Sequence, residues 1–233
     1  MAKLFEGALR NWKFTFAFTV FAALFVLLQI WYQSTLPNTI ELFAIIRGLG
    51  FSGATMIAAS LFSSIVFRFY PKYAKFWTVR RALGVAGFIA IVLHIYYVVF
   101  VGSGGDLVLL FSILNPFQNP LVFGLLGFLI FLPVALTSTD WAMQKLAGKW
   151  KAIHRLVYFG FWASIFHFLL LNPPALMNLA GFFLIALTAA TLLGELYWFI
   201  RVAGMKKYRS IGTLIGLIVI LLYLAGFYFA YFA

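Results

Sequence analysis

The sequence predicts an all-α integral membrane protein, a helical bundle of about seven transmembrane helices. Three observations support this prediction: 65% of the 233 residues are hydrophobic, only 9% are charged, and the apolar residues form long runs separated by short basic loops. A soluble domain of this length could not bury so much apolar surface. We expect one transmembrane domain over residues 1–233, with no length left for a soluble catalytic domain.

Seven apolar runs follow one another along the chain. We expect spans at about residues 14–32, 43–67, 82–101, 121–136, 150–171, 175–200 and 211–232. The first run lacks a small-residue cleavage site, so it is expected to be a span and not a signal peptide. Between the third and fourth runs, Gly, Asn and Pro interrupt the chain, and LVLLFSIL is expected to form a short interfacial helix. After the fourth run, TSTD is suited to cap a short helix that ends near residue 147. No internal repeat is apparent.

The basic residues gather in alternate loops. With the N-terminus assigned to the cytoplasm, 16 of the 17 basic residues lie on the inner side, and only Arg47 lies outside. This asymmetry predicts a cytoplasmic N-terminus and an extracytoplasmic C-terminus. The formal net charge of +12 therefore indicates topology and contact with anionic lipid, not nucleic-acid binding. The absence of cysteine excludes disulfides, iron–sulfur clusters and covalently attached haem.

Two histidines lie deep in different apolar runs. His94 follows Arg81 by 13 residues and His167 follows His154 by 13, so each lies about 20 Å from the inner end of its helix. An ionisable side chain within a membrane costs free energy unless it binds or pairs, and it therefore indicates function. The matched depth predicts that His94 and His167 are axial ligands of one haem iron between two helices. The alternative is that a neighbouring hydroxyl or carbonyl satisfies each imidazole.

The third histidine, His154, lies near the cytoplasmic end of its run. It does not share a helix face with His167 unless the helix is bulged or overwound. Arg80 and Arg81 occupy the position where a partner for an inner haem would be expected. Several roles stay open: ligation of a second haem, contact with a flavin or quinone, a proton path, or a place among the headgroups. Arg80, Arg81 and Arg155 would contact inner propionates or a flavin phosphate, or would only anchor the topology.

Two further charged residues lie near the ends of spans. Arg47 would pair with haem propionates near the outer surface, or would extend to the interface as an isolated arginine. Glu195, in the inner part of the sixth run, is expected to pair with Arg201 or to face His154.

Two strings carry a family resemblance. RRALGVAGFIAIVLH and ALTSTDWAMQKLAGKWKAIHRLVYFGFWASIFH resemble the ferric-reductase-like transmembrane family, and within it the MsrQ type, the haem-binding membrane subunit of the methionine-sulfoxide reductase system. The resemblance covers about residues 41–200. It implies a six-helix core that binds b-type haem, with His94, His154 and His167 as candidate metal ligands, and it associates the family with flavin mononucleotide. The N-terminal part and the seventh span lie outside the shared core.

The sequence and the resemblance together predict transmembrane electron transfer by haem b, with one haem expected and a second left open. The donor would be a cytoplasmic flavin reductase or quinol, and the acceptor an extracytoplasmic redox protein. We expect an electron-transfer subunit without catalytic residues of its own. One alternative is the membrane subunit of a ferric reductase or oxidase that works with a separate flavin reductase. Another, from a different class, is a transporter or structural membrane protein without haem.

Overall fold

The computed structural model describes residues 2–198 together with residues 201, 218, 221 and 225. The regular elements of this part are helices: α1 (Ala2–Ser34), α2 (Glu41–Phe69), the 3-10 helix η1 (Pro71–Phe76), α3 (Trp77–Tyr96), the π-helix η2 (Tyr97–Gly102), α4 (Leu107–Leu110), α5 (Leu121–Leu136), α6 (Asp140–Leu146), α7 (Gly148–Arg155), α8 (Val157–Leu171), the 3-10 helix η3 (Pro173–Met177) and α9 (Leu179–Trp198). The prediction of an all-α membrane protein is confirmed.

Five helical segments are long and apolar enough to cross a membrane: Lys13–Ser34, Glu41–Phe69, Pro71–Gly102, Gly148–Leu171 and Leu179–Trp198. Helices α5 and α6 pass the same test only as a pair, and the chain bends by 91° between them. They make a sixth span if the pair is counted as one broken span. The described residues therefore contain five or six of the seven expected spans. The expected seventh span, at residues 211–232, lies outside the described part except for three isolated positions.

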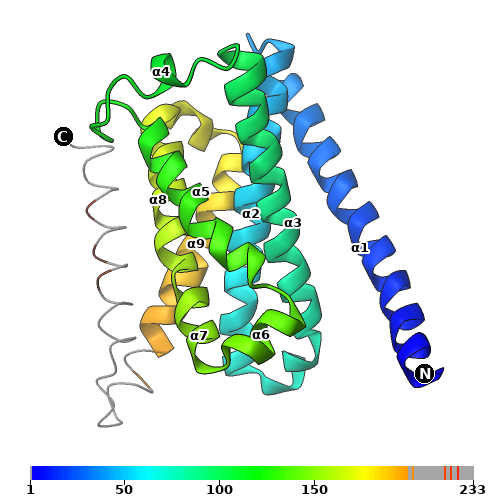
Figure 1. The fold of residues 1–233 in the computed structure, drawn as a ribbon. Helices are drawn as coiled ribbons and strands as arrows, with labels where there is room; N and C mark the ends of the chain where they lie inside the picture. Colours follow the sequence, from blue (N-terminus) through cyan, green and yellow to red (C-terminus); the bar gives the residue numbers. More distant parts are fainter. Residues whose placement is uncertain (1, 199–200, 202–217, 219–220, 222–224, 226–233) are drawn as a thin grey trace.

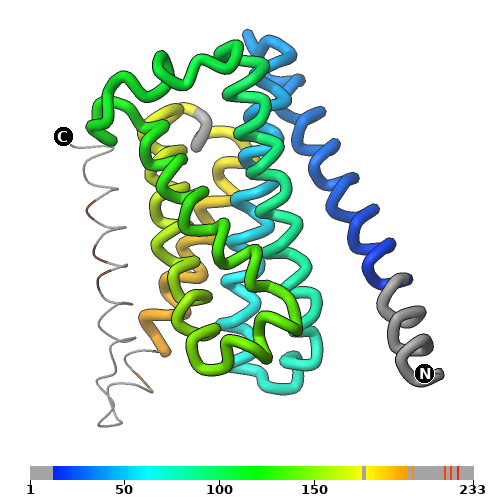
Figure 2. The backbone as a smooth tube through the Cα atoms, in the orientation of Figure 1, coloured from blue at the N-terminus to red at the C-terminus, as the bar shows by residue number. Residues whose placement is uncertain are grey.

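Helix α2 lies at the centre of the bundle and packs against α1, α3 and α9, while α5 packs against α8 (Figure 1). Helix α1 meets α2 near the C-terminal end of α1 and leans away from the bundle toward its own N-terminus (Figure 2). A Cβ atom added to Gly48 would lie 2.6 Å from the Cα of Ile30, so the two backbones touch at this crossing. Such close contacts through small residues are the usual way in which membrane helices associate.

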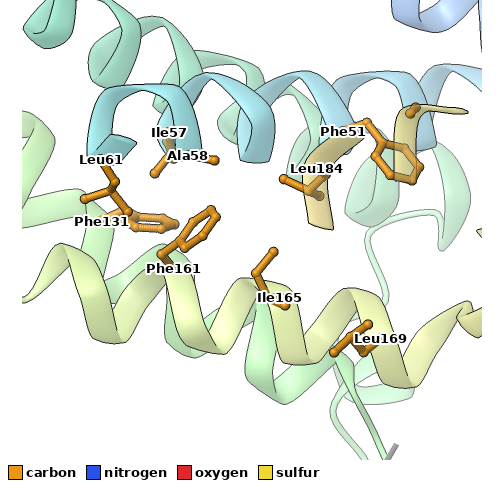
Figure 3. Close-up of a cluster of buried hydrophobic side chains, with 10 residues drawn as sticks. Phe51, Ile57, Ala58, Leu61, Phe131, Phe161, Ile165, Leu169 and Leu184 are labelled. Atoms are coloured by element: carbon orange, nitrogen blue, oxygen red, sulfur yellow. The ribbon is translucent and has the colours of Figure 1, made fainter. Parts of the chain in front are cut away.

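The core lies on the faces where α2, α5, α8 and α9 meet (Figure 3). Phe131 from α5 and Phe161 from α8 lie against Leu61 of α2, and Leu184 of α9 is fully buried. The outward faces are also apolar, and side chains such as Phe182 are mostly exposed. This pattern is that of a bundle whose surrounding medium is lipid.

The expected fifth span is not one continuous helix. Helix α7 ends at Arg155 and α8 begins at Val157, and at the break the N–H of Leu156 bonds to the carbonyl of Ile153 at 3.0 Å. The local change from the i−4 to the i−3 acceptor changes the rotation of the chain between the two helices. The helix is therefore irregular between His154 and His167, so the rotation between these two residues is not that of one ideal helix.

The loop helices differ partly from expectation. The expected interfacial helix at residues 107–114 is the single turn α4, capped where the N–H of Leu109 donates to the side chain of Asp106 at 2.8 Å. In the TSTD segment, Thr139 is the cap of α6, since its hydroxyl oxygen accepts from the N–H of Ala142 at 3.1 Å. The sixth span starts at Leu179, later than expected, because the prolines of η3 open a 3-10 turn first.

Candidate functional site

The structure brings His94 of α3 and His167 of α8 together near the C-terminal ends of these two helices. Their imidazole centroids are 6.3 Å apart and the ring planes cross at 75°. Both side chains are half-buried. The two histidines therefore lie at the same level of the bundle, as their spacing in the sequence predicts.

Each imidazole is held by a main-chain carbonyl of a neighbouring segment. The Nδ1 atom of His94 lies 2.8 Å from the carbonyl oxygen of Ile46, and Nδ1 of His167 lies 2.9 Å from that of Pro120. A carbonyl oxygen can only accept, so these contacts assign the proton to Nδ1 in both rings and leave a lone pair on Nε2. Among the described residues, no hydrogen bond to either Nε2 is found.

The surroundings of the two histidines repeat each other, contrary to our expectation that the sequence has no internal repeat. The pattern G-F-x-A-x-x-x-H occurs at residues 87–94 in α3 and at residues 160–167 in α8. In both copies the glycine and the alanine are buried. A search for short patterns aligned on the histidines would have revealed this signal, which is too brief to stand out as a repeat of whole helices.

The separation of the two rings matches that of two imidazoles bound to one metal ion. Two metal–nitrogen bonds of about 2 Å, with about 1 Å from each nitrogen to its ring centre, would separate the centroids by about 6 Å. The observed separation is 6.3 Å. In the described part of the chain, no group of three or more His, Cys, Asp or Glu side chains that could hold a metal ion is found. Two imidazole ligands on opposite sides of one ion is the arrangement that haem iron takes in bis-histidine proteins.

His154 has a different environment from the other two histidines. Its ring stacks on Trp150, with centroids 3.9 Å apart and planes inclined by 27°. Its Nε2 lies 3.2 Å from the hydroxyl of Thr137, and that hydroxyl donates to the carbonyl of Pro133 at 2.7 Å. Because the hydroxyl proton is used in this way, Nε2 of His154 is the donor to Thr137. The nitrogen that is free in His94 and His167 is thus occupied in His154.

His154 lines a cavity of about 140 Å³ at the end of the bundle formed by α6 and α7. The polar and aromatic residues around it include Trp77, Arg80, Arg81, Thr139, Trp150 and His154. The guanidinium of Arg81 donates to the carboxylate of Asp140 and to the carbonyl of Ser138. The structure therefore gathers Arg80, Arg81 and His154 in one site. Arg155 is exposed and is not among the residues that line the cavity.

Arg47 lies on α2 next to the residue that holds His94. It is half-buried, and its guanidinium carbon is 6.0 Å from the centre of the Phe43 ring. Residues three apart are neighbours on a helix surface, so Arg47 lies one turn from Gly50, which contacts His94. Contact with haem propionates stays a prediction for this residue.

Glu195 pairs differently from our expectation. It forms an ion pair with Arg68, with 2.6 Å between Oε2 and the guanidinium nitrogen, and its Oε1 accepts from the hydroxyl of Tyr158 at 2.6 Å. Arg201 instead lies over the ring of Tyr197. The expected partner was wrong because packing of α9 against α2, which loop charge and hydropathy do not specify, brings Arg68 close to Glu195.

Comparison with known proteins identifies the family of this chain. Residues 49–165, about half of the chain, match the family described as the ferric reductase like transmembrane component. The chain belongs to this family. The matched part of this ferric reductase like protein includes His94 and His154 and ends just before His167.

Three similar proteins from Brucella species share one name. The chain is 32% identical over 93 residues to the protein-methionine-sulfoxide reductase heme-binding subunits MsrQ of Brucella ovis, Brucella canis and Brucella melitensis. These alignments cover 39% of this chain and 41% of each relative, so the chain spans less than half the length of the curated relatives it matches. No solved structure matches.

Proposed function

We propose that this protein holds one b-type haem between His94 and His167 and transfers electrons across the membrane. The observation that supports this most directly is the pair of imidazoles from two different helices, 6.3 Å apart, each tied through Nδ1 and open at Nε2. Relatives of this chain are named heme-binding subunits. A haem supplies one-electron chemistry when bound.

The role of the chain itself is to bind and orient. His94 and His167 would both ligate the haem iron, and ligation by two histidines favours electron relay over chemistry at an open metal position. Arg47 would pair with the propionates on the outer side. The chain would act as an electron-transfer subunit of an oxidoreductase, in one transmembrane domain over residues 1–233 with a family core at about residues 41–200.

We propose that electrons move from the cytoplasmic side to the extracytoplasmic side. The basic inner side would place the N-terminus in the cytoplasm of a prokaryotic cell. The donor would be a cytoplasmic flavin reductase or quinol, and the acceptor an extracytoplasmic redox protein, as proposed for an MsrQ-like subunit. Membrane lipid would contact the apolar outer faces of the helices.

The inner cavity is the proposed place of contact with the donor or a second cofactor. Its volume of about 140 Å³ is below the roughly 300 Å³ at which ligand pockets usually begin, and Nε2 of His154 is occupied by Thr137. The occupied nitrogen of His154 favours contact with a flavin or quinone edge at this site over ligation of a second haem. Arg80 and Arg81 would then face the anionic or carbonyl oxygens of that cofactor.

A visible spectrum of the purified protein tests the main proposal. We expect a Soret band and sharp α and β bands on reduction, which neither a transporter nor a purely structural protein would give. His94→Ala and His167→Ala should each abolish the six-coordinate low-spin spectrum. His154→Ala, as a matched variant, should retain it. A full low-spin spectrum in both ligand variants would contradict the assignment.

A ferric reductase or oxidase subunit is the second candidate, supported by the family description. It differs in the acceptor, which would be ferric iron or oxygen. The dithionite-reduced protein is mixed separately with a ferric chelate, with air, and with a methionine-sulfoxide reductase and its sulfoxide substrate. The reagent that reoxidises the protein fastest distinguishes the second candidate from the first. Fast reoxidation by ferric chelate alone would favour the second candidate.

A further inference from the structure

We infer that Gly50 and Gly124 are positioning residues that keep the imidazoles of His94 and His167 bonded to main-chain carbonyls. Gly50 follows the acceptor Ile46 by four residues, and Gly124 follows the acceptor Pro120 by four. On both α2 and α5, the glycine thus lies four residues after the carbonyl that accepts from a histidine. The expected effect of these glycines on a bound haem rests on the proposed function, whereas their contact with the histidines does not.

The spacing of four has a physical reason. In an α-helix the carbonyl of residue i bonds to the N–H of residue i+4, and the side chain at i+4 leans toward the N-terminus, over that carbonyl. A glycine at i+4 leaves the carbonyl open to an outside donor. A Cβ atom added to Gly50 would lie 3.2 Å from Nδ1 of His94, and one on Gly124 would lie 3.1 Å from Nδ1 of His167.

The carbonyl of Pro120 shows how the outside donor is accommodated. It accepts from the N–H of Phe123 at 3.1 Å and from the N–H of Gly124 at 3.4 Å, while the bond from Nδ1 of His167 is shorter at 2.9 Å. The long helical bond leaves the imidazole as the closest donor. A methyl group at Gly124 would have to displace the ring by a few tenths of an ångström, and this would weaken the bond.

The hydrogen bond at Nδ1 determines how a histidine behaves as a metal ligand. It fixes the tautomer and the ring orientation, and it raises the basicity of Nε2. A weaker bond would make the ring a poorer donor to ferric iron, so the midpoint potential should rise. Loss of such partners typically lowers metal affinity by about 10–100-fold.

The test compares Gly50→Ala and Gly124→Ala with the wild-type protein in detergent. Each variant is titrated with haemin, its midpoint potential is measured, and its low-spin signal is recorded by electron paramagnetic resonance (EPR). We expect a haemin affinity lower by roughly 10–100-fold, an upward shift of the potential and a changed largest g value. The two glycines lie on different helices, so one variant still tests the inference if the other does not fold.

Two control variants separate positioning from helix packing. A Cβ on Gly148 meets nothing within 4 Å, so Gly148→Ala should match the wild type. A Cβ on Gly194 of α9 would lie 2.5 Å from Cγ2 of Ile65, and its three nearest atoms all belong to Ile65, so Gly194→Ala should lower thermal stability without moving the potential. Unchanged potential and EPR signal in both Gly50→Ala and Gly124→Ala would overturn the inference. Absence of haem from the wild type would instead overturn the proposed function.

Discussion

The ring planes of His94 and His167 cross at 75°, closer to perpendicular than to parallel. Imidazoles in perpendicular planes interact with different iron d orbitals and leave these orbitals nearly equal in energy. We therefore predict that the ferric protein gives a highly anisotropic low-spin EPR signal with one dominant g value. A rhombic signal with three well-resolved g values, typical of parallel rings, would show that the rings turn when haem binds.

The bonded state of His154 predicts the haem count. Because its Nε2 is engaged by Thr137 and its ring lies on Trp150, we expect one haem per chain in the wild type and in His154→Ala. The pyridine haemochrome assay measures this ratio. Reduction by the cytoplasmic donor should slow in His154→Ala, while dithionite should reduce both proteins alike. Two haems in the wild type, with one lost in the variant, would assign His154 as a ligand.

The loop charges predict the orientation of the chain. The natural sequence has no cysteine, so single cysteines can be introduced without background labelling. An impermeant maleimide added to intact cells should label cysteines placed at Ser103 and Asn172, and should not label one placed at Gln144. Labelling at Gln144 alone would mean that the chain is inverted.

The contacts of Glu195 predict a loss of stability when the carboxylate is removed. Glu195→Gln would leave Arg68 without its ion-pair partner and would weaken the bond from Tyr158. Since Arg68 is 36% and Glu195 23% exposed, we expect a loss of about 1–3 kcal/mol, between the values for surface and buried pairs. Thermal unfolding in detergent measures it, and Tyr158→Phe allows a double-mutant cycle. Additive effects would show that the bond between Tyr158 and Glu195 contributes no stability.

The amide of Gln33 predicts a stabilising substitution. The side chain is 0% exposed, and neither its oxygen nor its nitrogen has a hydrogen-bond partner among the described residues. An unpaired buried polar group costs about 1–3 kcal/mol, so Gln33→Leu should raise the unfolding temperature. Gln118→Leu, the same change at an exposed position, should have little effect. A less stable Gln33→Leu protein would indicate that the amide has a partner in the membrane.

The sequence predicts those features of the protein that depend on hydropathy and on the depth of a residue along its helix. The spacing of His94 from Arg81 and of His167 from His154 was enough to place two imidazoles at one level, because rise per residue is constant in a helix. Rotation is less predictable, since the break at Leu156 changes which face His154 presents.

Contacts between distant helices were harder to predict. The carbonyls of Ile46 and Pro120 carry no sequence signal of their own, because every residue has one. The pairing of Glu195 with Arg68 depends on how α9 packs against α2, which neither hydropathy nor charge specifies. The glycines beside the histidines were visible in the sequence, and only the geometry of the helix pairs gives them a role.

The depth of the His94–His167 pair has an electrical consequence. With the proposed orientation, an electron that arrives from the inner surface moves about 20 Å outward, roughly two thirds of a hydrocarbon core about 30 Å thick. A unit charge that crosses the whole membrane gains about 2.3 kcal/mol per 100 mV. A cell interior that is electrically negative would therefore favour this first step by about 1.5 kcal/mol per 100 mV. Reduction of the pair in energised vesicles would then be voltage-dependent, and an uncoupler would shift its redox poise.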